Sequence, residues 1–224
     1  MGTQWNADTE LVWDGSALHI FWLMGSELRH RSTTDGVNWT PTHIQTKALD
    51  YVSPTIHHHE GIFYMWFVGL TVEGGVFDEG YQRWRHLVML QTATSPHGPW
   101  TTPQDCETMS GAMADSDPWH IGVTRWRDQW VMTAGLGEIG WGGGGRVAVL
   151  ASSLDGNLWS VADGALLRSE QGTWTERRIY RPSPLVEGGR LRIWFSALGT
   201  SGARIGHVEV PASVIPAPPP PHLP

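Results

Sequence analysis

The chain has 224 residues, a formal net charge of −7 and only 17% charged residues. That length suits one well-cored domain or two small ones, and the 27 glycines, 15 prolines and 14 tryptophans indicate a turn-rich, β-rich protein. No apolar run approaches the roughly 20 residues of a membrane-spanning helix. The first residues do not show a basic segment followed by an apolar one, so we expect neither a membrane span nor a secretory signal, and the location of the protein stays open.

The charge and the cysteine content narrow the function further. Basic residues are scattered and outnumbered by acidic ones, which argues against a protein that grips nucleic-acid phosphates. Cys106 is the only cysteine, so an intrachain disulfide and a thiolate metal cluster are excluded. We expect Cys106 to be a packed or surface thiol rather than a nucleophile.

A repeat runs through most of the chain. Each of four segments has an apolar run, a polar turn and a second apolar run that ends in glycine: 11–25, 52–69, 117–135 and 182–199. This pattern is typical of a β-hairpin. The sequence therefore predicts four hairpins at regular intervals.

A second hairpin follows the first in three of the four units, at 28–39, 86–100 and 146–159, and each of these ends in tryptophan. The fourth unit keeps one strand, 203–210, and then runs into proline. Two hairpins make a four-stranded antiparallel sheet, and four such units in tandem predict an all-β fold, a β-propeller that spans residues 1–210. A degenerate fifth blade is the alternative to a four-bladed ring.

Residues 211–224 form a separate proline-rich tail. Proline cannot donate to a β ladder, so an extended polyproline II conformation is expected there. The tail is either a disordered terminus or a strap that docks on a protein partner.

Several short motifs resemble those of the five-bladed β-propeller glycosidases, the superfamily of arabinanases, β-xylosidases, levansucrases and invertases. The motifs are the strand openings Ser53-Pro54, Asp117-Pro118 and Ser183-Pro184, the second strands Tyr64–Phe67 and Ile193–Ser196, and the turn Ala93–Trp100. The turns at 33–39 and 153–159 also look like the Asp-box of sialidase propellers, which is structural in that family. The resemblance implies a propeller with its site on the face where the innermost strands begin.

That geometry sorts the candidate residues by face. On the site face we place 50–54, 115–120 and 181–183, overhung by long loops at 70–85 and 136–145. The opposite face takes 35–36, 155–156 and the run His57–Glu60. Successive residues of a strand or turn point in different directions, so the three consecutive histidines are not expected to bind a metal ion, and no metal or other cofactor is predicted.

Glycoside hydrolysis requires two carboxyl groups beside the scissile bond. The resemblance implies an aspartate from the first blade, a second from a middle blade and a glutamate from a later one, and only Asp117 matches this set. The first unit opens without Asp-Pro, while Ser53 and Arg181 stand at the equivalent openings of the second and fourth units. The sequence therefore favours a protein that is not an enzyme. If it is one, a glycoside hydrolase that uses Asp117 with Glu138 or Glu79 is expected.

Tryptophan indoles can stack on sugar rings, and several lie in or beside the predicted site-face loops. We predict that the following residues bind the ligand: Trp84, Asp115, Trp119, His120, Trp141, Trp174 and Arg181. The glycine-rich segment 140–145 lacks the Lys-Ser/Thr ending of a phosphate loop, so nucleotide binding is not expected.

Three hypotheses follow. The first is a non-catalytic carbohydrate-recognising or adhesive subunit, plausibly of a larger surface or virion assembly. The second is a glycoside hydrolase with a relocated carboxylate pair, and the third is a structural scaffold or decoration subunit held by its tail. The expected partners are a glycan or polysaccharide and, through the tail, a protein.

Overall fold

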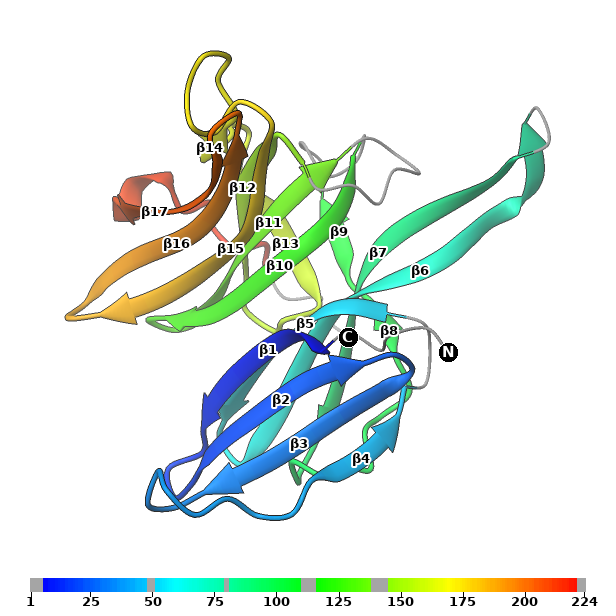
Figure 1. Ribbon diagram of the computed structural model, residues 1–224, viewed down its shortest axis with the longest axis vertical. Coiled ribbons are helices and arrows are strands. Elements are labelled where there is room, and N and C mark those ends of the chain that lie inside the picture. Colours follow the sequence, from blue (N-terminus) through cyan, green and yellow to red (C-terminus); the bar gives the residue numbers. More distant parts are fainter. Residues whose placement is uncertain (1–5, 48–50, 79–80, 110–115, 138–144, 221–224) are drawn as a thin grey trace.

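The computed structural model describes residues 6–47, 51–78, 81–109, 116–137 and 145–220. It is an all-β molecule in which four antiparallel sheets form a ring, a four-bladed β-propeller (Figure 1). The predicted fold class is therefore confirmed. Among the described residues, no helix has the length and apolar character to cross a membrane.

Each blade is made from strands that follow one another in the chain. Blade 1 comprises β1 (Asn6–Trp13), β2 (Leu18–Met24), β3 (Glu27–Thr33) and β4 (His43–Thr46). Blade 2 comprises β5 (Tyr51–His59), β6 (Ile62–Asp78), β7 (Tyr81–Ala93) and β8 (Gln104–Asp105). Blade 3 comprises β10 (Asp117–Trp126), β11 (Gln129–Gly137), β12 (Val147–Ser153) and β13 (Leu158–Val161), with β9 (Glu107–Met109) parallel to β13 and β14 (Leu167–Arg168) paired with β12.

Blade 4 has three strands, β15 (Arg178–Glu187), β16 (Arg190–Gly199) and β17 (Gly202–Val210). This agrees with the sequence, in which the fourth unit keeps a hairpin and one further strand before it runs into proline. β17 ends at Val210 because Pro211 follows it, and proline has no N–H for a further ladder.

Alternating side chains give the blades their apolar faces, and those faces pack between neighbouring sheets. Phe21, Phe63 and Phe67 belong to the cluster between blades 1 and 2. A second cluster, around Trp66 and Trp159, lies between blades 2 and 3. Two more clusters join blade 3 to blade 4: Trp126, Val131, Leu150, Leu191, Ile193 and Val210 in one, and Ala148, Ile179, Phe195 and Ala197 in the other.

The two predicted Asp-box-like turns have the same hydrogen bonds. The amide of Gly156 donates to Ser153 Oγ at 2.8 Å, and Asp155 Oδ1 accepts from the amides of Asn157 and Leu158. Thr33, Asp35 and Gly36 repeat the arrangement in blade 1. These carboxylates close turns on the face opposite the strand openings, so they support the fold.

The segment 70–85 is not the loop expected from the sequence. Strands β6 and β7 continue through it as a two-stranded ribbon, paired from Phe63↔Ala93 to Asp78↔Tyr81. In Figure 1 this ribbon extends away from the four sheets. It projects from the end of blade 2 at which β5 begins, because Tyr51 pairs with Gly69.

The described part of the tail lies along the propeller itself. Pro211 leads into a short 3-10 helix, η1 (Ala212–Val214), and Ile215 packs against the larger cluster between blades 3 and 4. Ser152 Oγ then donates to the carbonyl of Pro216 at 2.7 Å. The tail therefore connects blade 4 to blade 3, and a contact with a protein partner stays a prediction.

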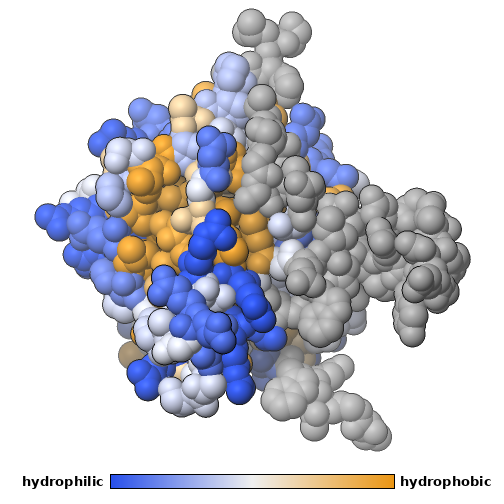
Figure 2. Space-filling model, turned by 90° about the horizontal axis from the view of Figure 1, so that it is seen from above, coloured by the Kyte–Doolittle hydropathy of each residue, from blue (hydrophilic) through white to orange (hydrophobic). Residues whose placement is uncertain are grey.

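Apolar atoms also reach the surface. The view from above shows an apolar area surrounded by hydrophilic side chains (Figure 2). Several large apolar side chains on the first strand of blade 1 and on blade 4 are substantially exposed: Leu11, Trp13, Leu185, Trp194 and Ile205.

Candidate ligand site at the propeller channel

A β-bulge interrupts the innermost strand of every blade near its start. The ladder register shifts between Ala7 and Glu10, Val52 and Thr55, Pro118 and His120, and Tyr180 and Ser183. Asp8, Ser53 and Arg181 lie within these bulges with φ angles of +53°, +51° and +48°. A left-handed backbone is uncommon for residues other than glycine, so three of them at equivalent positions mark a specialised region.

We call this region the channel mouth, defined by Asp8, Glu10, Ser53, His120, Tyr180 and Arg181. Asp8 is its central anion. It accepts a hydrogen bond from the amide of Ser53 at 2.9 Å and forms an ion pair with Arg181. Three blades thus meet at one carboxylate.

Glu10 shares the same guanidinium. Arg181 Nη2 lies 3.2 Å from Glu10 Oε1 and also donates to the carbonyl of Thr9. Burial raises the pKa of Glu10 to about 7, against the opposing effect of the Arg181 charge. A carboxyl group with such a pKa can donate a proton near neutral pH.

His120 hydrogen-bonds Ser53 through Nδ1, with 2.5 Å between Nδ1 and Oγ. Its other ring nitrogen, Nε2, is buried and has no hydrogen-bond partner among the described residues. Burial lowers the pKa of His120 to about 4, so the ring is neutral at physiological pH. The Tyr180 ring lies edge-on with its centroid 4.0 Å away, and Nε2 is therefore a polar atom available to a ligand or water beside an aromatic ring.

Asp117 lies next to this group on β10. Its side chain is only 2% exposed, and His86 Nδ1 donates to Oδ2 at 3.0 Å. The half-buried Trp119 places its ring edge-on to His86, with 5.2 Å between centroids. Asp117 therefore takes part in a buried hydrogen bond that links blades 2 and 3.

A groove of about 540 Å³ continues from the channel mouth along the inner strands. It is lined by residues 9–13 of β1, 55–58 of β5, 121–124 of β10 and 181–185 of β15, together with Trp194. Trp13 and Trp194 are 59% and 46% exposed, while Glu10 and Arg181 supply charged groups at the same groove. We call it the channel groove.

The structure brings together only some of the predicted site residues. His120 and Arg181 lie at the channel mouth, with Asp117 and Trp119 beside it. Trp174 lies elsewhere, half-buried and stacked on Phe195 in blade 4. Five predicted residues cannot be placed, because Glu79, Asp115, Glu138 and Trp141 lie outside the described residues and only the backbone of Trp84 is described.

Sequence reasoning missed Asp8, Glu10, His86, Tyr180 and both groove tryptophans. The first unit opens without the Asp-Pro pair that the resemblance implies, yet Asp8 and Glu10 both lie at the channel mouth. The available signal was two acidic residues just before the first apolar run, at a position that corresponds to Ser53 of the second unit.

The other candidate reactive groups, the three consecutive histidines and Cys106, are packed against neighbouring side chains. His57 and His59 place their rings edge-on to Trp130, whereas His58 faces Phe63, so the rings diverge as the strand alternation requires. Among the described residues, no group of three His, Cys, Asp or Glu side chains could hold a metal ion. Burial raises the pKa of the Cys106 thiol to about 12, which makes it a poor nucleophile.

Comparison with solved structures identifies the class of fold. The chain matches five-bladed β-propeller glycosidases and a sialidase at low sequence identity. A family 117 glycoside hydrolase from Zobellia galactanivorans matches with a TM-score of 0.67 at 12% identity, over 95% of this chain and 68% of its own. The GH32 β-fructofuranosidase of Bombyx mori matches with a TM-score of 0.64 at 15% identity, over 92% of this chain and 46% of its own.

The sialidase of Trypanosoma rangeli, solved with sialic acid, matches with a TM-score of 0.58 at 13% identity, over 92% of this chain and 36% of its own. The chain thus spans less than half the length of the fructofuranosidase and the sialidase. No protein-family model and no curated protein matches the sequence. At these identities the likeness concerns the fold alone.

Proposed function

We propose that this propeller is a non-catalytic carbohydrate-recognising module that binds a glycan in the channel groove. The observation that carries the proposal is the pair of half-exposed indoles, Trp13 and Trp194, in a groove that also presents Glu10 and Arg181. Indole faces stack on the C–H surface of sugar rings, and charged and polar groups orient the hydroxyls.

The carboxylates support binding over catalysis. Asp8 is held by the Arg181 guanidinium and the Ser53 amide, and Asp117 is buried against His86. Groups fixed in this way contribute to the structure of the channel. Neither carboxylate then needs to be free for a glycan to bind.

The test is a glycan array followed by titration of intrinsic tryptophan fluorescence with the oligosaccharides that bind. Trp13→Ala and Trp194→Ala are each expected to weaken binding about tenfold, the effect of losing roughly 1.4 kcal/mol. Trp39→Ala is the matched control, because Trp39 lies at the blade 1 turn and does not line the groove. Unchanged affinity in both groove variants would exclude this binding site.

A second candidate, glycoside hydrolysis, is favoured by one observation. Glu10 has a raised pKa and shares the Arg181 guanidinium with a second carboxyl group, Asp8. A carboxyl group with a raised pKa can act as a general acid. Asp117 on β10 of blade 3 is a further carboxyl group near this site.

An aryl-glycoside panel tests this candidate with Glu10→Gln and Asp117→Asn, each checked for folding by circular dichroism. A hydrolase would lose at least about 100-fold in turnover with Glu10→Gln, the usual scale of general acid catalysis. A binding module would show no turnover and would keep its glycan affinity in Asp117→Asn. Assembly into a surface or virion particle stays a prediction that neither assay addresses.

A further inference from the structure

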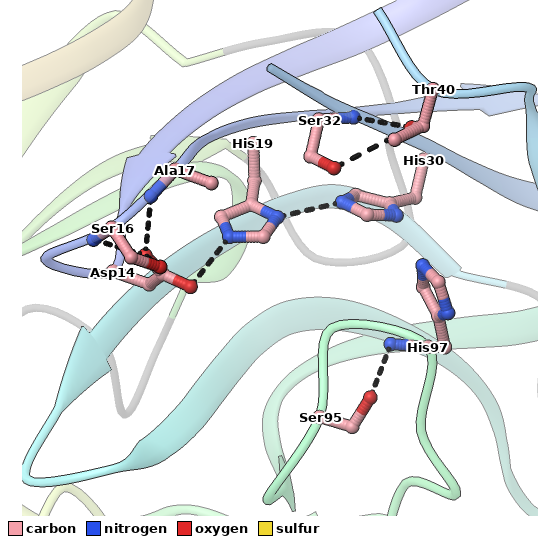
Figure 3. Close-up of polar contacts among 9 residues, drawn as sticks. All are labelled: Asp14, Ser16, Ala17, His19, His30, Ser32, Thr40, Ser95 and His97. Carbon is pink, nitrogen blue, oxygen red and sulfur yellow. Dashed lines mark hydrogen bonds and ion pairs between the residues drawn. The ribbon is translucent and has the colours of Figure 1, made fainter. Parts of the chain in front are cut away.

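Four histidines connect blade 1 to the outer turn of blade 2. His19 and His30 come from β2 and β3, and His97 comes from the turn between β7 and β8 (Figure 3). His43 comes from β4. His19 and His30 are almost fully buried, at 4% and 2% exposure. The cluster lies apart from the channel groove, because none of these four residues lines it.

The four rings form a continuous series. His19 Nδ1 lies 2.9 Å from His30 Nε2. The His30 and His97 ring centroids are 5.0 Å apart, and the His97 ring stacks on His43 at 4.5 Å. Since His97 belongs to blade 2, the series crosses between two blades.

Asp14 fixes the protons at one end. Its Oδ2 accepts from His19 Nε2 at 2.9 Å, and although burial opposes it, hydrogen bonds from Ala17, His19 and Ser16 lower the pKa of this carboxyl. Since His19 Nε2 donates to Asp14, the hydrogen bond at His19 Nδ1 can be completed by a proton on His30 Nε2. His30 Nδ1 is then a buried acceptor, and no partner for it exists among the described residues.

The groups around His30 disfavour a positive charge on its ring. Around His30 stand the other titratable rings His19, His43 and His97, and beyond the Phe63 ring lies His58. The Arg31 guanidinium, on the same strand, donates to the carbonyls of Thr40 and Trp39. Asp14 is the one carboxylate bonded to the cluster within the described residues, and His19 already uses it.

Burial lowers the pKa of His30 to about 3, with added repulsion from the other rings, and it lowers the pKa of His97 as well. His30 is therefore neutral at physiological pH, in a cluster whose rings stack and share one hydrogen bond. Any proton added beyond the Asp14–His19 pair enters without a counter-charge.

We propose that the His19–His30–His43–His97 cluster is an acid-sensitive latch, which holds the 94–100 turn of blade 2 against blade 1 while its rings are neutral and releases that turn when they are protonated. The response would be local, since residues 94–100 lie between β7 and β8 and belong to no β ladder. Histidines that leave the cluster regain an ordinary pKa and bind protons in mildly acid conditions, which would thus loosen one turn before the propeller unfolds.

Hydrogen exchange of the full chain tests the latch, with protection factors for the amides of residues 94–100 measured at about pH 7.5 and about pH 5 in the presence of a chelator. In the native sequence these factors are expected to fall by about tenfold on acidification, more than those of the β10 and β11 amides. His97→Gln should reduce the change to less than about twofold, because the ring opposite His30 can no longer be protonated. His30→Phe should do the same while keeping the aromatic contact with Phe21.

His207→Gln is the matched control, since His207 is exposed on β17 and stacks on Trp194 away from the cluster. It should retain the full acid response. His97 is exposed, so His97→Gln carries the test if His30→Phe does not fold. Equal protection of the turn at both pH values in the native sequence, or an unchanged acid response in His97→Gln, would overturn the proposal.

Discussion

Asp8 and Arg181 form an ion pair between blade 1 and blade 4, the first and last blades of the ring. Apolar clusters join blade 1 to blade 2, blade 2 to blade 3, and blade 3 to blade 4. Within the described residues, no such cluster joins blade 4 to blade 1. Polar contacts of the Arg181 guanidinium therefore contribute more to holding this junction together than polar contacts do at the other three junctions.

Arg181→Met is expected to lower the free energy of unfolding by about 1–3 kcal/mol, because Asp8 and Glu10 would lose their cation while staying largely buried. Denaturant unfolding measures this change. Arg190→Met is the control, since Arg190 is exposed and pairs with Glu209 at the surface, where removal is expected to change stability by less than about 1 kcal/mol. Equal effects of the two substitutions would contradict a structural role for Arg181.

Glu10 predicts a specific pH dependence. Its pKa is about 7 in the folded protein against 4.5 ordinarily, so the fold binds this proton more tightly than the unfolded chain does. The resulting stabilisation is present below about pH 4.5 and is lost as the pH rises through about 7, by at most about 3 kcal/mol. Glu10→Gln removes this contribution.

Unfolding free energies of the native sequence and of Glu10→Gln should therefore be compared from about pH 4.5 to about pH 8. The variant should gain stability relative to the native sequence as the pH rises. Contributions from the histidines cancel in this difference, since both proteins contain them. A difference that does not change with pH would show that Glu10 titrates normally.

The two Asp-box-like turns offer a matched pair of glycines. Gly36 and Gly156 have φ angles of +76° and +82°, but only a Cβ at Gly156 would meet the Trp66 ring, at 2.8 Å. Gly36→Ala should cost about 1 kcal/mol, for the backbone alone. Gly156→Ala should cost at least about 2 kcal/mol more, since Trp66 is fully buried and cannot move aside easily. Thermal and denaturant unfolding measure both.

Deletion of residues 212–224 should destabilise the propeller by about 1–3 kcal/mol, because Ile215 leaves the cluster between blades 3 and 4 and the Ser152–Pro216 hydrogen bond is lost. Ser152→Ala removes only the hydrogen bond and should cost about 1 kcal/mol. Denaturant midpoints compare the two. A deletion without effect would mean that the tail contributes nothing to the fold.

Much of the fold could be predicted from the sequence because each blade is local. Apolar alternation and short turns place strands that pair with their neighbours in the chain, so the hairpins at 52–69 and 117–135 are visible without long-range information. The Ser153–Gly156 turn is equally local. The early end of blade 4 follows from Pro211.

The candidate site was harder to predict because bulges create it. At each bulge the ladder register shifts, so the in-and-out alternation that locates a side chain is interrupted where Asp8, Ser53 and Arg181 lie. Contacts between residues 171 and 173 positions apart, those of Arg181 with Glu10 and Asp8, leave no local pattern. The His19–His30–His43–His97 cluster could not be predicted from the sequence for the same reason, because its members come from three strands and a distant turn.

The order of strands has a mechanical consequence. Each blade is completed by its own stretch of chain, and in the part that the structure describes no strand is exchanged between blade 4 and blade 1. Separation of blade 4 from blade 1 would therefore break side-chain contacts, the Arg181–Asp8 ion pair among them, while the β ladders of the described residues stay intact. The ring should open more readily at this junction than at the three that apolar clusters join.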